Sequence, residues 1–419
     1  MKIPVKWMMW AVCMPPYFFA FFQRTATSVF GVELAALFGL SGAVTGLLAA
    51  MYFYIYAAMQ LPNGFLADSV GPRRMMLFGG LIMGAATTAF AFPLSLTYAM
   101  IVRFCIGFGA SFYFVAILKL QTNWFTPAEF PLISGLTIFI GNCGALFGVG
   151  PFALLAAAFT WQMVFIVFGL LTIIFAVIGF LIVRDHPAQY SKPHMPPSLK
   201  ETLKTIFTEP RNYCTLIAFA FSNGPYIAFA SLWGVPFLMH CYGITKIDAS
   251  GFTVWLPIGV AFGCMFNGII AARFGSERRA LLTILSFAAI GWAIIAFVRF
   301  PGNLWLYRPV FFALGFCIAS LNLIFTTVQK HTPAPMSGSA FAFTNMGGFI
   351  MISTLQPLCG FILDLSVGVR SPGSIPPVYP DSAYRIMLSM LLIIHCLSVA
   401  AYYLTEKVGR RHRPAGTAA

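Results

Sequence analysis

Apolar stretches of about 20 residues recur along almost the whole chain, and they constrain its fold more than any other feature. A helix of that length crosses the roughly 30 Å hydrocarbon core of a bilayer. Hydrophobic residues make up 59% of the chain and charged residues only 9%, too little polar surface for a soluble globule. The stretches lie at residues 7–30, 41–66, 75–93, 96–120, 131–155, 161–183, 212–239, 249–272, 280–298, 303–328, 337–364 and 383–404. The sequence therefore predicts an all-α integral membrane protein with twelve transmembrane helices.

The composition changes after the sixth apolar stretch, where proline, lysine and glutamate become frequent. We interpret this segment as a linker between two bundles of six helices. Within it, the sequence SLKETLKTIF predicts a short amphipathic helix on the membrane surface. The predicted organisation is an N-terminal bundle at 1–184, a cytoplasmic linker at 185–211, a C-terminal bundle at 212–406 and a basic cytoplasmic tail at 407–419.

Two loops in corresponding places of the bundles resemble each other. GFLADSVGPRRMML follows the second apolar stretch and aligns without gaps with GIIAARFGSERRALL, which follows the eighth, so that Gly64 matches Gly268 and Gly71 matches Gly275. Transporters built from two similar bundles show such weak internal symmetry. The repeat therefore predicts two pseudo-symmetric six-helix bundles.

The basic excess of the chain is distributed unevenly across the predicted membrane. The net charge is +14, and the loops on the side of both termini carry 17 Lys and Arg against 5 on the other side. Loops rich in Lys and Arg stay in the cytoplasm. We therefore expect both termini to be cytoplasmic, and anionic lipid rather than nucleic acid to be the partner of these cations.

The loop after the second apolar stretch also resembles a signature motif of the major facilitator superfamily. The resemblance implies a fold of twelve helices and a cycle in which the two bundles rock. It also implies that the motif latches the bundles together on the cytoplasmic side. The residues that this assigns to a cytoplasmic gate are Gly64, Asp68, Gly71, Arg73 and Arg74.

Within the superfamily, the first part of the chain is similar to the organic-anion transporters of the anion:cation symporter group. The shared pattern is Arg24 in the first stretch, followed by Tyr56, Gln60, Pro62 and Gly64. The resemblance to this subgroup extends over only about the first 115 residues of the chain.

The fourth stretch both follows and departs from that group. Arg103 and Gly107 fit the Arg-x-x-x-Gly pattern of the superfamily, but Ala110 stands where the anion:cation symporter group has a glutamate that serves proton coupling. The resemblance therefore implies an organic-anion transporter, and the departure predicts weak coupling to protons.

Arg24 is the residue whose position most needs an explanation, because no acidic residue lies in the middle of any predicted helix. A charged group at membrane depth requires a partner or a water-filled cavity. We expect Arg24 to face a cavity between the bundles and to pair with an anionic group of the substrate. The alternative is that Arg24 binds backbone carbonyl groups or reaches Glu33.

Several polar side chains in the predicted helices are candidates for substrate contacts, although amides in membrane helices also join helices to one another. Gly224 and Pro225 predict a bend in the seventh helix. The single deep histidine, His395, is interpreted as a packed residue. The predicted substrate-binding residues are Arg24, Arg103, Tyr56, Asn223, Asn322, Asn345 and Gln356.

These patterns favour a secondary transporter that moves a small carboxylate-bearing anion across the bacterial inner (plasma) membrane by alternating access, as a monomer. The alternatives are an amino-acid or dipeptide transporter, an efflux pump, and a membrane receptor or scaffold that transports nothing. The sequence has no phosphate-cradling loop, no paired carboxylates and no Ser, His and acid set at a plausible depth. We therefore expect no enzymatic activity, no cofactor and no bound metal.

Overall fold

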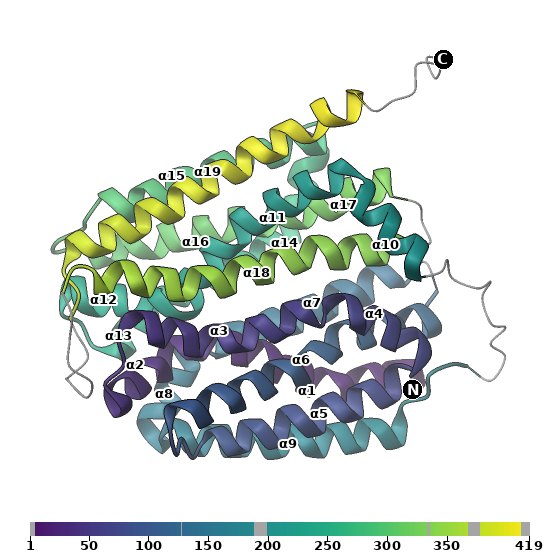
Figure 1. Ribbon diagram of the computed structural model, residues 1–419, viewed down its shortest axis with the longest axis horizontal. Coiled ribbons are helices and arrows are strands. Elements are labelled where there is room, and N and C mark those ends of the chain that lie inside the picture. Colours follow the sequence, from purple (N-terminus) through teal and green to yellow (C-terminus); the bar gives the residue numbers. More distant parts are fainter. Residues whose placement is uncertain (1–4, 127, 188–198, 333–335, 368–377, 412–419) are drawn as a thin grey trace.

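The computed structural model describes residues 5–126, 128–187, 199–332, 336–367 and 378–411. The side chains of Asp68 and Asn322 lie outside this description. All regular elements of the described residues are helices. Figure 1 shows them running side by side along the long axis, with both ends of the chain at one end of the molecule.

The N-terminal half contains nine helices, and its core is formed mainly by residues between 9 and 183. The helices are α1 (Val5–Thr25), α2 (Thr27–Phe38), α3 (Gly42–Ala58), α4 (Gln60–Ser69), α5 (Pro72–Phe90), α6 (Leu96–Trp124), α7 (Phe130–Phe147), α8 (Gly150–Phe159) and α9 (Trp161–Ile182).

The C-terminal half begins with the predicted amphipathic helix, α10 (Leu199–Thr208), and has its own core between residues 206 and 402. A π-helical stretch (Phe229–Trp233) follows Pro225, where the sequence predicts a bend. The other helices are α11 (Pro210–Ala228), α12 (Gly234–Tyr242), α13 (Lys246–Thr253), α14 (Trp255–Arg273), α15 (Glu277–Phe297), α16 (Tyr307–Ile318), α17 (Asn322–His331), α18 (Ser337–Asp364) and α19 (Asp381–Arg411).

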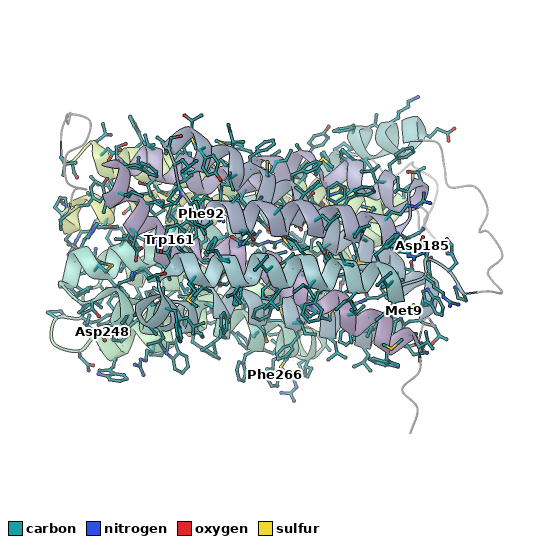
Figure 2. All side chains as sticks on the ribbon, turned by 90° about the horizontal axis from the view of Figure 1, so that it is seen from below. Met9, Phe92, Trp161, Asp185, Asp248 and Phe266 are labelled. Carbon is teal, nitrogen blue, oxygen red and sulfur yellow. The ribbon has the colours of Figure 1, made fainter. Side chains whose placement is uncertain are left out.

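Eight spans in the described part of the chain are long and apolar enough to cross a membrane, and two bent helix pairs add two more. The bends are 45° between α3 and α4 and 47° between α7 and α8. Helices α1 and α5, with 21 and 19 residues, are each about 30 Å long by helical rise, but they are not among these ten spans. Exposed apolar side chains such as Phe266 project from the sides of the bundle (Figure 2), as lipid contact requires.

The two halves meet mainly along α3 and α18, which lie antiparallel in the middle of the molecule (Figure 1). Ala49 of α3 belongs to the core of the C-terminal half, and Phe349 and Ile352 of α18 belong to that of the N-terminal half. We call the end with both termini the terminal end, and the opposite end, where α2, α12 and α13 lie, the far end. Figure 2 shows Met9 and Asp185 at the terminal end and Asp248 at the far end.

The two loops that resemble each other in sequence also match in backbone conformation. Gly71, before α5, has φ +87°, and Gly275, before α15, has φ +62°. Residues with a side chain rarely adopt such backbone angles, so glycine is favoured at both turns. Gly64 and Gly268 differ from this pattern, because a Cβ atom at either position would meet nothing within 4 Å. No described residue of another element therefore packs closely against Gly64 in this conformation.

Candidate functional site

Arg24 lies near the end of α1, at the boundary between the two halves. Its guanidinium carbon is 3.9 Å from the ring centre of Phe21, 4.8 Å from that of Tyr56 and 5.3 Å from that of Phe349. We call these three rings the aromatic cage. Phe21 and Tyr56 belong to the N-terminal half and Phe349 to the C-terminal half, so the cage is complete only when both halves are in place.

The hydrogen-bonding capacity of Arg24 is not fully used inside the cage. Its Nε atom is buried and has no hydrogen-bond partner in the described structure, and the Tyr52 hydroxyl lies within hydrogen-bonding reach of its side chain. Glu33, the alternative partner considered from the sequence, forms an ion pair with Lys246 instead. Aromatic faces attract a cation but leave its N–H donors available. The guanidinium can therefore donate to an anionic ligand.

Arg103 has a different environment from Arg24, although both were predicted to bind substrate. It is completely buried in the N-terminal half. Its terminal nitrogens donate to Oε1 of Gln23 at 3.0 Å, to the carbonyl oxygen of Gln23 at 2.6 Å and to Oγ1 of Thr27 at 2.5 Å. Arg103 therefore fastens α6 to α1 and α2, and Tyr52 lies beside its guanidinium at 5.3 Å.

The amides of α18 occupy one face of that helix. Asn345 donates from Nδ2 to Oε1 of Gln60 at 3.1 Å, a hydrogen bond between the two halves close to Tyr56. Gln356 donates to Oγ of Ser231 at 2.9 Å. Residues 345, 349 and 356 are spaced by about one and three helical turns, so their side chains point the same way. The structure thus places Asn345 beside the cage and Gln356 further toward the far end.

Asn223 and Asn322 are placed less directly. Asn223 of α11 faces α18, because a Cβ atom at Gly348 would lie 3.2 Å from its Nδ2 atom. Gly348 immediately precedes Phe349, so Asn223 packs against the turn of α18 that carries the cage ring. Asn322 is the first residue of α17, and its side chain lies outside the described residues.

A separate cavity of about 750 Å³ lies at the terminal end of the C-terminal half, between α14, α15, α17 and α19. Its wall contains Glu277, which accepts hydrogen bonds from Lys330 at 2.6 Å and from Thr326 at 3.1 Å. None of the predicted substrate-binding residues lines it. In the described part of the chain, no group of three or more His, Cys, Asp or Glu could hold a metal ion.

The residues of the predicted gate lie at the terminal end, and one of them has a partner that the sequence did not suggest. The backbone N–H of Arg73 donates to Oδ1 of Asp185 at 2.7 Å, and its Nε donates to the carbonyl oxygen of Phe180 at 2.7 Å. A Cβ atom at Gly71 would lie 2.8 Å from the same carboxylate. Arg74 is exposed. In this conformation Arg73 contacts its own half.

A family model described as Major Facilitator Superfamily matches residues 15–355, most of the chain. The chain belongs to the major facilitator superfamily. The fold class predicted from the sequence, an all-α membrane protein with the fold of this superfamily, is thereby confirmed.

Curated relatives in this superfamily are moderately similar to the chain. It is 28% identical over 191 residues to the probable sulfoacetate transporter SauU of Cupriavidus necator, a match that covers 46% of the chain and 44% of SauU. It is 25% identical over 367 residues to the hexuronate transporter of Bacillus subtilis, covering 82% of the chain and 85% of that protein. The match to SauU thus spans less than half of that relative.

Solved structures of the superfamily share the fold of the chain. A bacterial homologue of the human lysosomal transporter Spinster, solved in an inward-facing and occupied conformation, superposes with a TM-score of 0.77 over 100% of both chains. The sequence identity is 18%, so this similarity concerns the fold alone.

Four residues that matter at these sites were not predicted from the sequence. Gln23 and Thr27 hold Arg103, Phe349 closes the cage and Asp185 supports the gate. Gln23 could have been found as a second polar residue beside Arg24 in an apolar stretch. Phe349 gave no signal, because the chain contains 45 phenylalanines and its neighbour Arg24 is 325 positions away.

Proposed function

We propose that the chain is a secondary transporter for a small organic anion that carries a carboxylate, and that Arg24 binds this group. The observation that supports the proposal most strongly is the caged guanidinium of Arg24. It lies between the halves, and within the described residues its buried Nε has no partner and its guanidinium is stacked on rings rather than paired with a carboxylate. A planar guanidinium binds a carboxylate with two parallel hydrogen bonds.

The position of Arg24 also fits a transport cycle. Tyr56 lies about 21 Å of helical rise from the far end of α3 at Gly42, near the middle of the membrane. Substrate sites of such transporters lie at mid-depth between the two repeats, and rocking of the repeats exposes them to each side in turn. Because one ring of the cage comes from the other half, rocking would open and rebuild the environment of Arg24.

The names of the curated relatives support the same substrate class. Sulfoacetate and hexuronate, which name two of them, are both small anions with a carboxylate. An efflux pump for organic cations would need an acidic residue at the site, where the chain has a cation instead. Asn345, Gln60 and Asn223 are proposed to contact other polar groups of the substrate.

The distribution of charge supports an orientation with the terminal end in the cytoplasm of a bacterial cell. Arg73, Arg184 and Lys330 lie at that end, and Lys246, Arg299 and Arg385 at the other. By the positive-inside rule, both termini would be cytoplasmic. We propose that the protein works as a monomer in the inner membrane, with Asp68, Arg73 and the turn at Gly71 forming a cytoplasmic gate.

Uptake into proteoliposomes tests the proposal. The panel contains labelled sulfoacetate, glucuronate, a monocarboxylate, a zwitterionic amino acid and methyl viologen, each offered to vesicles with and without the same compound inside. We expect saturable exchange of at least one carboxylate and none of the cation. Exchange of the amino acid alone would favour the second substrate class, and no exchange of any compound would contradict a transporter of small carboxylates.

Arg308 provides a matched control for the role of Arg24. It also stacks on aromatic rings, 3.6 Å from Trp305 and 5.3 Å from Phe252, and its Nε is also buried without a partner in the described structure. It lies in the C-terminal half at the far end, away from the cage. Loss of exchange in Arg24→Ala but not in Arg308→Ala would assign the effect to the position of Arg24 between the halves.

A further inference from the structure

The far ends of α3 and α18 are joined by one carboxylate. Asp364, the last residue of α18, accepts a hydrogen bond from the backbone N–H of Gly42 at 2.8 Å and from that of Ala43 at 2.9 Å. The hydroxyl of Tyr379 donates to the same carboxylate at 2.6 Å. Gly42 and Ala43 begin α3 in the N-terminal half, whereas Asp364 belongs to the C-terminal half. The carboxylate therefore connects the halves directly.

This contact completes a helix terminus with a group from the other half. The first N–H groups of a helix have no partner within it, and they favour negative charge. Ser41, the residue that precedes α3, accepts a hydrogen bond from Val44 N at 3.4 Å. Asp364 accepts the hydrogen bonds of the two N–H groups before it, those of Gly42 and Ala43. If the halves separate at this end, Gly42 and Ala43 lose their acceptor and Asp364 loses two donors at once.

The surrounding backbone is packed so closely that side chains cannot intervene. A Cβ atom on Gly42 would lie 2.8 Å from the carbonyl oxygen of Gly360, and one on Gly46 would lie 2.2 Å from that of Gln356. Such distances are shorter than any real Cβ contact, so α3 and α18 touch through their backbones. The ion pair between Glu33 and Lys246 also joins the halves at this end.

We propose that Asp364 is a latch between the halves. Its hydrogen bonds to Gly42 and Ala43 hold the far end closed and must break each time the transporter opens toward that side. The latch is connected to the substrate site by two continuous helices, because α3 carries Tyr56 and α18 carries Phe349. Asp364 is thus a positioning residue that sets the balance between open and closed states. Its role in the cycle rests on the proposed transport function, whereas its effect on the conformation can be measured without transport.

The decisive variant is Asp364→Asn. Asparagine has nearly the same size as aspartate, but it carries no negative charge. Its amide N–H₂ group would also face a backbone N–H group that needs an acceptor. Spin labels at Leu37 and Val378, which are 61% and 71% exposed near the far end in opposite halves, report the separation there. The nine free cysteines are first replaced in a background that folds normally. We expect the ratio of open to closed molecules to rise by at least about tenfold, because hydrogen bonds to charged groups are strong.

Asp248→Asn is the matched control. Asp248 also lies at the far end and accepts from Oγ1 of Thr245 at 2.7 Å, but this contact stays within one half. The latch is supported if Asp364→Asn lengthens the label distance and Asp248→Asn leaves it unchanged. It is overturned if folded Asp364→Asn keeps the short distance, or if the unmodified far end already shows mainly the long one.

A milder variant provides a second test in case Asp364→Asn does not fold. Tyr379→Phe removes one of the three donors to Asp364 and should raise the open population by a smaller factor. If Asp364→Asn does not fold, an unchanged distance in Tyr379→Phe overturns the latch. Because distances are measured without substrate, their outcome is independent of Arg24→Ala, which tests the proposed function alone.

Discussion

The environments of Arg24 and Arg103 differ far more than their sequence surroundings do. Both arginines lie in apolar helices of the N-terminal half, and both stack near Tyr52 or Tyr56. The terminal nitrogens of Arg103 make three hydrogen bonds to Gln23 and Thr27, whereas the guanidinium of Arg24 is enclosed by aromatic rings. The Nε atom of each arginine is buried without a partner in the described structure, so the two differ in what surrounds their terminal nitrogens.

The comparison shows that the unfavourable free energy of a charge inside a membrane can be offset in two ways. Neutral oxygens of the chain accept hydrogen bonds from the terminal nitrogens of Arg103 and make it part of the fold. Aromatic faces compensate Arg24 only partly, since a cation–π contact contributes about 0.5–2 kcal/mol. The charge of Arg24 therefore remains only partly stabilised by the chain, at the boundary between two halves that move. Such an arginine is suited to bind and release an anion during each cycle. The comparison therefore reassigns Arg103 from substrate contact to support, as a proposal.

The largest expected effect is the loss of transport when Arg24 is changed. Arg24→Ala should lower uptake of the carboxylate substrate by roughly 100-fold or more, because truncating one partner of a buried charge pair costs about 2–5 kcal/mol. Arg24→Lys should recover little, since an ammonium cannot form the two parallel hydrogen bonds. Uptake is measured per folded molecule, with the melting temperature as the check on folding. Near-normal uptake by both variants would remove the distinction between the two arginines.

The second effect is on stability and concerns Arg103. Arg103→Ala should lower the free energy of unfolding by about 2–4 kcal/mol, because it leaves acceptors on Gln23 and Thr27 buried without donors, at about 1–3 kcal/mol for each unsatisfied group. Thermal unfolding in detergent measures the loss, and Arg24→Ala should change the melting temperature much less. If Arg103→Ala melts like the unmodified protein but no longer binds substrate, Arg103 is a substrate contact as the sequence predicted.

The third effect concerns the ring that the C-terminal half adds to the cage. Phe349→Leu keeps an apolar side chain but removes the face that lies 5.3 Å from Arg24, so the substrate affinity should fall by about threefold to tenfold. Phe252→Leu removes a ring at the same 5.3 Å distance from Arg308 and should leave the affinity unchanged. Equal changes in both variants, measured from the concentration dependence of uptake, would show that the cage has no special role.

The fold was largely predictable because hydropathy reports which segments are apolar, and helices of a bilayer must be apolar over their whole length. The bends were not predictable in this way. The break after Thr25, the 45° turn before Gln60 and the π-helical stretch after Pro225 depend on local hydrogen bonding. Pro62 and Pro225 lie beside the last two, and only Pro225 was interpreted from the sequence as a bend.

The candidate site was predictable in its cations but not in its partners. Arg24 and Arg103 were found because a charge in an apolar stretch is conspicuous. What distinguishes them lies far away in the sequence, since Arg103 meets Gln23 and Arg24 meets Phe349 only after folding. The contact of Asp364 with Gly42 spans 322 positions, and no local pattern encodes it.

The smallest expected effect is the response to a proton gradient. Symport with protons needs a group that takes up a proton near neutral pH as the substrate binds. Ala110 is buried where the related group has a glutamate, and neither arginine accepts a proton under these conditions.

Glu129, at the terminal end, does not supply such a group either. The hydrogen bond from Lys6 lowers the pKa of Glu129 from 4.5 to about 2, so this carboxylate stays ionised at physiological pH. Its contribution to stability is complete above pH 4.5 and is lost only as the pH falls toward 2. Glu129 therefore cannot load a proton near pH 7.

An inward proton gradient should consequently change the final accumulation of substrate in vesicles by less than about twofold, whereas preloaded substrate should accelerate uptake strongly by exchange. Empty and preloaded vesicles with the same imposed gradient are compared, with a protonophore as the control. Strong uphill uptake that the protonophore abolishes would show that a carboxylate elsewhere in the chain carries the proton. In that case the two arginines differ in their partners but do not by themselves determine the coupling.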